Sequence, residues 1–290
     1  MTTSTPPSRG GAPAALAAYL MWGVFGLYFK ALAAVPAPEI LAHRVLGGAL
    51  FALLLLAVRG QAGAALRVFR NGRLVAGLGA SALAIAVNWG VFIWAVAAGR
   101  ALEASLGYFL FPLVSVVLAR LFLGERLTRR QQAAAAVVAA AVAWLVVQGH
   151  GLPWVALVLA VSFGAYGLLR KTLPVDSLAG LFVETVLLAP LAAGWLVAVG
   201  GGTATAIGGA IPWLLALAGP VTAIPLVLFA YGARRMRLST LGLMMYVNPT
   251  VQMLVAVFVF GEPFTATHGV AFAGIWVGLA LYSWPAARRT

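Results

Sequence analysis

Ser105-Leu-Gly-Tyr-Phe-Leu-Phe-Pro112 and Thr240-Leu-Gly-Leu-Met-Met-Tyr-Val-Asn-Pro249 are two copies of one stretch of sequence. Each copy continues as an apolar run that ends in Gly-Glu, first at Glu125 and then at Glu262. From the proline onward, the copies align without a gap. A proline inside an apolar helix bends it, and a membrane tolerates the freed carbonyl group where a neighbour or a cavity satisfies it. Two bent helices in corresponding places favour a duplicated membrane transporter over a simple anchor.

The composition indicates a chain that is built for a bilayer. Hydrophobic residues make up 63% of the 290 residues, charged residues 9%, and the mean hydropathy is +1.02. A soluble domain carries about a quarter charged residues. The apolar runs are unbroken rather than alternating, which excludes a membrane barrel. We therefore predict an all-α integral membrane protein with about ten spanning helices, at residues 13–33, 38–58, 74–98, 103–123, 130–148, 152–170, 178–199, 210–232, 238–260 and 267–284.

The basic residues predict the orientation of these helices. The net charge of +13 would suggest nucleic acid in a soluble protein, but here the arginines fall in loops that set a membrane topology, so no nucleic-acid partner is expected. With the N-terminus inside, the outer side keeps only Lys30, Arg44 and Arg100. This asymmetry predicts that both termini are cytoplasmic and that the protein lies in the cell inner membrane. The absence of cysteine excludes disulfides and thiolate metal sites, and we expect no metal and no cofactor.

The repeat extends beyond the opening stretch. We expect a disordered tail at 1–12, a first five-helix repeat at 13–148 and a second at 149–290 with a short basic tail. An odd number of helices per repeat inverts the second repeat in the membrane and predicts a shared cavity near the bilayer midplane. Three residues of the first helix correspond to three of the sixth at one constant spacing. Gly23 corresponds to Gly164, Gly26 to Gly167 and Lys30 to Lys171.

The residues that follow the two bent helices have the pattern of helix starts. Thr128 and Thr265 fit as N-caps of the fifth and tenth helices, and Thr128 to Gln131 has the spacing of a capping box. A negative charge just ahead of a helix N-terminus is stabilising. We therefore interpret Glu125 and Glu262 as structural residues.

A set of short motifs spans nearly the whole chain: Tyr28-Phe-Lys30, Glu39-Ile-Leu-Ala-His-Arg44, Asn88-Trp89, Leu102-Glu-Ala-Ser-Leu-Gly-Tyr-Phe109, Tyr166-Gly-Leu-Leu-Arg-Lys171 and Gly261-Glu-Pro-Phe264. Together these motifs resemble the RarD permeases, which belong to the EamA branch of the drug/metabolite transporter superfamily. The resemblance implies two EamA repeats in an inner-membrane permease, sometimes labelled chloramphenicol-sensitive, whose natural substrate is poorly defined. Phe111 departs from the pattern, because the family usually shows Asn before the first proline; Asn248 holds the equivalent place in the second half.

Ionisable residues inside predicted spans are the first candidates for function. Glu184 is the only acid well inside a span, so it could exchange a proton and couple transport to a gradient, or it could pair with a basic residue and join two helices. His43 holds the equivalent position in the second helix and could gate transport or relay protons. Arg44 could pair with Glu39 or Glu103, or meet an anionic group of a substrate. Lys30 could face a substrate or extend to the outer surface.

Amide and aromatic side chains are the candidates for a cavity lining. Asn88 must find a partner in an apolar helix, either across helices or in a cavity. Aromatic side chains could line a cavity for flat or amphipathic solutes, or anchor helix ends at the membrane surface. The candidates for the lining are Tyr28, Trp89, Trp94, Tyr108, Tyr246 and Asn248.

These observations favour a secondary transporter that moves a small organic metabolite or drug-like solute by alternating access. Coupling of this transport to protons is a further hypothesis, which depends mainly on Glu184. An intramembrane enzyme that acts on a lipid is the alternative, although the few His, Asp and Glu residues are dispersed. A channel is disfavoured because no ring of charges is apparent. The expected partners are the solute, membrane lipid and protons, and the chain could be a monomer or a homodimer.

Overall fold

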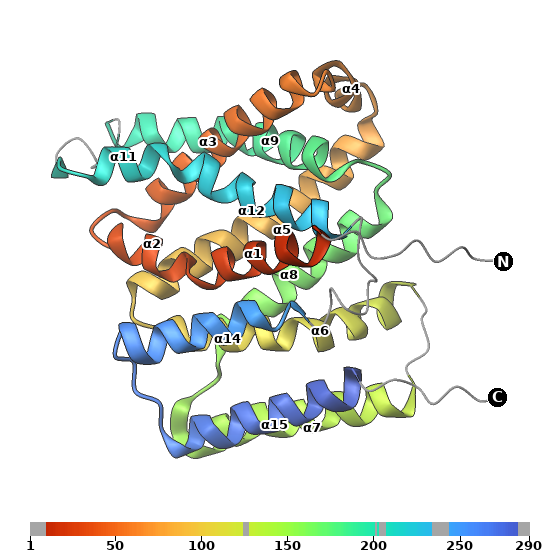
Figure 1. The fold of residues 1–290 in the computed structure, drawn as a ribbon, viewed down its shortest axis with the longest axis vertical. Coiled ribbons are helices and arrows are strands. Elements are labelled where there is room, and N and C mark those ends of the chain that lie inside the picture. The colour runs from red at the N-terminus through yellow and green to blue at the C-terminus, as the bar shows by residue number, and fades with distance from the viewer. Residues whose placement is uncertain (1–9, 124–127, 201, 203–206, 234–243, 284–290) are drawn as a thin grey trace.

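The computed structural model describes residues 10–123, 128–200, 202, 207–233 and 244–283 of the chain. Within these residues, eight helices are long and apolar enough to cross a membrane, and two shorter apolar helices follow at Val247–Val259 and Ala266–Leu281. The prediction of an all-α membrane protein is confirmed. The long helices run across the page in Figure 1, some nearly level and others obliquely.

The helices follow the predicted order, with some spans divided. The bounds are α1 (Gly11–Gly23), α2 (Phe25–Ala31), α3 (Ala37–Val58), α4 (Ala62–Arg67), η1 (Val68–Arg70), α5 (Gly72–Ala97), α6 (Ala101–Leu123), α7 (Arg129–Leu145), η2 (Val146–His150), α8 (Trp154–Thr172), α9 (Ser177–Ala198), α11 (Ile211–Ala216), α12 (Ala218–Ala233), α14 (Val247–Leu254), η3 (Val255–Val259) and α15 (Ala266–Ser283).

Four elements differ from the expected helices, among them the eighth span, which is divided at Leu217 into α11 and α12. The first span is interrupted at Val24, where α1 ends and α2 begins. The preceding Gly23 lies so close to α14 that an added Cβ would fall 2.6 Å from Val251 Cβ, so only glycine fits this crossing. The ninth span was expected as one helix bent by Pro249, but α14 begins at Val247, and 234–243 lie outside the described residues. Between α3 and α5, the short helix α4 was not predicted.

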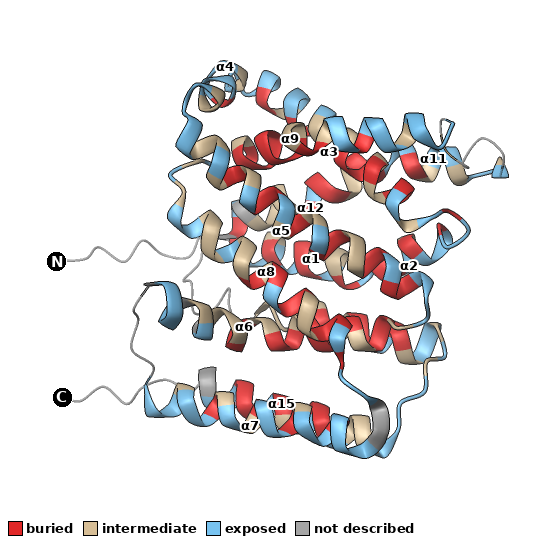
Figure 2. Cartoon of the chain, turned by 180° about the vertical axis from the view of Figure 1, so that it is seen from behind, coloured by how far each residue is buried: buried red, intermediate tan, exposed pale blue. Residues whose placement is uncertain are grey.

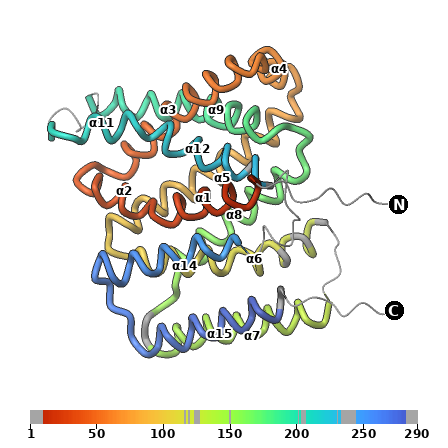
Figure 3. The backbone as a smooth tube through the Cα atoms, in the orientation of Figure 1, coloured from red at the N-terminus to blue at the C-terminus, as the bar shows by residue number. Residues whose placement is uncertain are grey.

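Contacts between the two halves of the chain occur in matching pairs. The most extensive contacts join α3 to α9, α6 to α8 and α7 to α15. In the two repeats, α5 corresponds to α12, α8 to α1 and α9 to α3. Accordingly, the contact of α5 with α8 has its counterpart in that of α12 with α1, and the contact of α5 with α9 in that of α12 with α3. Figure 3 shows α14 beside α6 and α15 beside α7. A two-fold relation between two repeats produces this pattern, although the repeat boundaries themselves stay a prediction.

The ends of the described chain lie on one side of the bundle. The start of α1 and the end of α15 are both at the right in Figure 1, which we call the terminal side; the connection between α2 and α3 lies on the opposite side. Buried residues gather where helices face one another, and the α7–α15 pair is exposed over much of its surface (Figure 2). Large apolar side chains such as Leu121 and Phe122, both 70% exposed, face outward, as a bilayer requires.

Helix caps hold these elements at their ends. The predicted capping box is confirmed: Gln131 N donates to Thr128 Oγ1 at 3.3 Å, and Thr128 N donates to Gln131 Oε1 at 2.9 Å. The structural role of Glu262 takes an unexpected form, because its two carboxylate oxygens accept from the backbone N–H groups of Ala101 and Leu102, each at 2.7 Å. Glu262 therefore caps α6 of the other half, while Glu125 lies outside the described residues.

Candidate functional site

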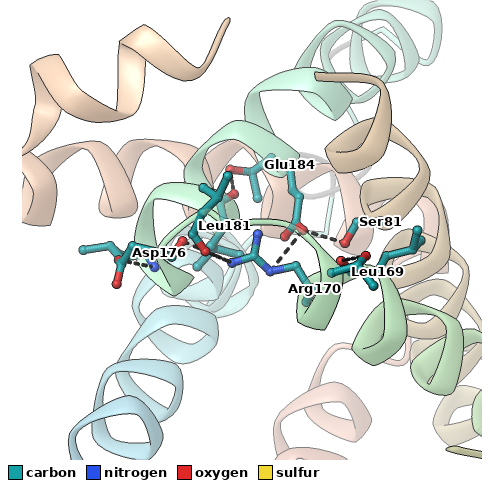
Figure 4. Close-up of polar contacts among 10 residues, drawn as sticks. Ser81, Leu169, Arg170, Asp176, Leu181 and Glu184 are labelled. Carbon is teal, nitrogen blue, oxygen red and sulfur yellow. Dashed lines mark hydrogen bonds and ion pairs between the residues drawn. The ribbon is translucent and has the colours of Figure 1, made fainter. Parts of the chain in front are cut away.

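Two polar clusters lie inside the bundle, and each is built from both halves of the chain. The first surrounds Glu184, the eighth residue of α9, which enters the bundle from the terminal side. Ser81 Oγ of α5 donates a hydrogen bond to Glu184 Oε1 at 2.6 Å, and Arg170 Nε of α8 lies 3.7 Å from the same oxygen (Figure 4). The Tyr166 side chain lies beside this carboxyl group. We call Ser81, Tyr166, Arg170 and Glu184 the acid cluster.

Arg170 was expected in a cytoplasmic loop, but it ends α8 and folds back into the protein, so that its side chain is only 13% exposed. Its guanidinium group lies against Gly180, where no side chain stands in the way. One Nη group also bonds the carbonyl oxygens of Val175 and Asp176, at 3.4 and 3.1 Å. Arg170 thus fastens the connection from α8 to α9 and brings its charge to Glu184.

The second cluster surrounds Arg44, the eighth residue of α3, which enters the bundle from the opposite side. Its side chain is 6% exposed, and its Nε donates to Thr222 Oγ1 of α12 at 2.9 Å. The guanidinium group lies 4.1 Å from the centre of the Trp89 ring and 5.5 Å from that of Phe29. We call Arg44, Trp89 and Thr222 the arginine cluster.

The acid and arginine clusters have corresponding positions in the two halves. The spacing that relates Gly23 to Gly164 also relates His43 to Glu184, and Ser81 to Thr222. In both places, a hydroxyl group from the third span of one half bonds an ionisable residue of the other half. By this spacing Glu184 corresponds to His43, and Arg44 is the next residue along α3. The two clusters differ in the partner of this hydroxyl group, which is the acidic Glu184 for Ser81 and the basic Arg44 for Thr222.

Aromatic side chains connect the two clusters. Trp89 packs in one apolar cluster with Ile85 and Leu181, against which Phe163 and Tyr166 are also packed. The Phe163 ring stacks on Tyr166 at 6.0 Å and meets Tyr108 at 5.9 Å, edge to face. An aromatic path thus runs from Arg44 to Glu184.

The other amide and aromatic candidates near this path mostly hold helices together. Asn88 Nδ2 donates to Leu159 O at 3.0 Å and to Ser162 Oγ at 3.2 Å, and Tyr108 donates to Asn88 Oδ1 at 3.0 Å. This is the interhelical bonding that the sequence left as one of two alternatives for Asn88. The Phe111 ring packs against that of Phe163 at 4.8 Å with the two planes tilted by 58°, so an aromatic contact takes the place of the missing amide at the first proline.

Several predicted residues lie away from the aromatic path. Trp94 is 39% exposed and packs on Trp154, and Lys30 is exposed above the Phe260 ring. The Tyr28 hydroxyl donates to Leu214 O at 2.7 Å and joins α2 to α11. Tyr246 precedes α14 and is half-buried.

The two remaining candidates are Asn248 of α14 and His43 of α3. Asn248 Oδ1 accepts from Gln252 Nε2 at 2.9 Å, and Gln252 Nε2 also reaches Trp22 O at 3.4 Å, close to the interruption at Val24. His43 is half-buried, and its Nε2 has no partner among the described residues. Neither residue belongs to the two clusters.

A cavity of about 290 Å³ opens on the opposite side, between the start of α6 and the start of α15. Its polar lining includes Arg100, Glu103, Glu262 and His268. Glu103 forms an ion pair with Arg100 and accepts from Val155 N at 2.9 Å, so it does not pair with Arg44. Both acids of this cavity therefore have partners within the protein: Glu103 pairs with Arg100, and Glu262 caps α6.

The sequence interpretation missed five members of this arrangement: Ser81, Phe163, Tyr166, Arg170 and Thr222. A signal existed for Ser81 and Thr222, because they correspond at the spacing of the repeat. For Arg170, the position at the end of a span favoured a loop, and only the fold of the α8–α9 connection brings it back to Glu184.

Comparisons with known proteins agree on one group of relatives. A family model described as the EamA-like transporter family matches residues 9–147. An uncharacterised transporter of Pseudomonas aeruginosa is 45% identical over 98% of this chain and 97% of its own length. The protein RarD of Escherichia coli is 41% identical over 95% of this chain and 94% of its own length. A solved crystal structure that is 22% identical covers 97% of this chain and 99% of its own, with a TM-score of 0.62, and shares the fold.

These relatives come from bacteria, and the chain carries at least eight apolar helices of spanning length. The protein is therefore a multi-pass protein of the bacterial plasma membrane.

Proposed function

Because this chain belongs to the EamA-like transporter family, we propose that it is a secondary transporter that moves a small organic solute by alternating access between its two halves. Its relatives are named transporters, so the alternative of a lipid-modifying enzyme no longer competes. The substrate is the open question.

The observation that carries this proposal is the placement of the two polar clusters. Arg44 and Glu184 are each the eighth residue of their helix, so each lies about 10 Å from the helix start, but on opposite sides of the bundle. Each is held by a hydroxyl group from the other half. A rocking motion of inverted repeats would open one cluster to the outside and the other to the cytoplasm in turn. In this proposal, both termini are cytoplasmic.

We further propose that Glu184 carries the coupling proton. The contacts of its carboxylate with Ser81 and Arg170 use Oε1, and the Tyr166 side chain lies beside the same group. Oε2 is buried without a hydrogen-bond partner among the described residues. That oxygen is the natural place for a proton. Protonation would weaken the pair with Arg170, which fastens the α8–α9 connection, and would release this connection for the transport motion.

Proteoliposomes that contain the purified protein test the transport itself. They are exposed to a metabolite extract with and without an imposed pH gradient, and the solutes that load are identified by mass spectrometry against empty liposomes. The proposal predicts enrichment of one chemical class of solute. If folded protein in both orientations enriches nothing, the proposal is wrong.

Glu184→Gln tests the coupling. We expect this variant to exchange solute across the membrane but to lose the extra accumulation that the gradient drives, because the amide cannot carry the proton. Glu103→Gln is the matched control, since Glu103 is paired with Arg100 on the opposite side, and it should keep gradient-driven accumulation. Full gradient dependence in Glu184→Gln would contradict the role of Glu184 and leave solute transport standing.

A further inference from the structure

Arg44 is a buried cation whose charge the described protein does not balance. Among the described residues, no carboxylate forms an ion pair with it, and only its Nε has a hydrogen-bond partner, Thr222. Arginine carries five N–H donors and stays charged, so it cannot neutralise itself as a buried carboxyl group can. An unbalanced charge inside a membrane is costly and usually functional.

Five of the six acids of the chain lie among the described residues, and each of them can be placed. Glu103 pairs with Arg100, Glu262 caps α6, Asp176 caps α9, and Glu184 pairs with Arg170. Glu39 lies against Gly202, and it stands five residues before Arg44 on α3, hence on another face of that helix. Glu125 lies outside the described residues.

The surroundings of Arg44 are suited to a ligand with both a charged and a flat part. Trp89 covers one face of the guanidinium group at 4.1 Å, and the two Nη groups of Arg44 have no hydrogen-bond partner among the described residues. Thr222 fixes one edge through Nε. A guanidinium group that is held in this way binds carboxylate or phosphate oxygens by two parallel hydrogen bonds. Beyond Trp89, the aromatic path continues through Phe163, which packs against the same apolar cluster and against Tyr108, so the surroundings of an apolar body at this place are rings and aliphatic side chains.

We propose that the solute is a small organic anion, whose negative group binds the Nη groups of Arg44 and whose flat or apolar part lies against Trp89 and Phe163. This inference rests on the proposed transport function and names its class of substrate. The negative group of the solute would then balance the charge of Arg44, as Glu184 balances that of Arg170 in the acid cluster. The anionic group is defined here by its chemistry, and carboxylates and phosphate esters both satisfy it.

The experiment sorts by charge the solutes that wild-type proteoliposomes accumulate from a metabolite extract. Arg44→Gln, Arg44→Lys and the control Arg100→Gln are measured in parallel, each after its folding is confirmed by size-exclusion chromatography. We expect wild type and Arg100→Gln to accumulate organic anions, and Arg44→Gln to lose at least roughly 30-fold of this accumulation because a buried charged hydrogen-bond partner is removed. Arg44→Lys keeps the charge without the planar fork, so it should accumulate anions more weakly than wild type.

The outcomes separate the two proposals. Accumulation of neutral or cationic solutes alone by wild type would overturn the anion inference and leave transport intact. Equal accumulation of anions by wild type and Arg44→Gln would also overturn it. No accumulation by wild type would contradict the transport function, and the inference with it. The charge class of the wild-type solutes decides the question even if the Arg44 variants fail to fold. Carboxylates and phosphate esters are distinguished by mass among the accumulated anions.

Discussion

Arg44 and Arg170 are both arginines inside the helical bundle, and both lie in clusters built from the two halves, yet their surroundings differ. Arg170 faces a carboxylate, with Nε 3.7 Å from Glu184 Oε1, and one of its two Nη groups donates to the backbone carbonyl oxygens of the α8–α9 connection. Arg44 faces the ring of Trp89 and a single hydroxyl group. A buried charge that is balanced inside the protein serves the fold, and one that is not balanced is available to a ligand.

Removal of each arginine should therefore have different consequences, and this is the largest effect that we expect. Arg170→Gln leaves Glu184 buried without its cation and should lower the free energy of unfolding by about 3–5 kcal/mol. Arg44→Gln removes a charge that has no protein counter-ion and one hydrogen bond, so its cost should be about 1 kcal/mol. Thermal unfolding midpoints in one detergent compare the two variants.

Arg170→Gln combined with Glu184→Gln is the control for this comparison. The double variant should recover part of the loss in midpoint, because no unpaired carboxylate remains. Equal losses in Arg170→Gln and Arg44→Gln would contradict the distinction between a structural and an available charge.

The crossing of α3 and α12 allows the arginine cluster to be disturbed from a distance. A Cβ on Gly219 would press into the backbone of Gly47, and Thr222 lies three residues further along α12. Gly219→Ala should cost about 1–3 kcal/mol by separating the two helices, and it should move Thr222 away from Arg44. Weaker accumulation of the solute and a lower unfolding midpoint would be seen together.

Gly167→Ala is the matched control for Gly219→Ala. An added Cβ at Gly167 meets nothing within 4 Å, so this variant should be as stable as wild type or slightly more so. If Gly219→Ala behaved like Gly167→Ala, the close approach of α3 and α12 would not be what places Thr222.

The smallest effect should come from the two hydroxyl groups that correspond between the halves. Thr222→Val removes the acceptor of Arg44 Nε and should weaken solute affinity by about 1 kcal/mol, with gradient dependence unchanged. Ser81→Ala removes the donor to Glu184 and should change gradient dependence, with solute affinity unchanged. Half-saturating solute concentrations, measured with and without a pH gradient, compare the two. Similar changes in both variants would contradict the assignment of solute binding to the arginine cluster and of proton coupling to the acid cluster.

The sequence was sufficient for those features that depend on composition and local spacing. The order of the helices follows from runs of apolar residues, and the cap at Thr128 follows from Gln131 three residues later. Glu262 was correctly interpreted as structural, but its partner lies at Ala101 and Leu102, some 160 residues away in the chain, which no local pattern reveals.

The site was less predictable because its members are brought together by tertiary packing. Glu184 and Arg44 stand out as charges inside apolar spans. Which of the two finds a counter-ion depends on how Arg170 folds back against Gly180, and this cannot be inferred from its place at the end of a span. The roles of Glu184, Arg44 and His43 in transport stay predictions.

The most direct test of alternating access between the two clusters uses the absence of cysteine from the chain. A single cysteine is introduced at Ile85, which lies between Arg44 and Glu184 in the Trp89 cluster, and its labelling by a membrane-impermeant maleimide is measured from each side of the membrane. Val58→Cys and Leu152→Cys, exposed on the terminal and opposite sides, are the one-sided controls. We predict that Ile85→Cys is labelled from both sides, and that transported solute lowers the labelling rate. Labelling of Ile85→Cys from one side only, with or without solute, would contradict the account.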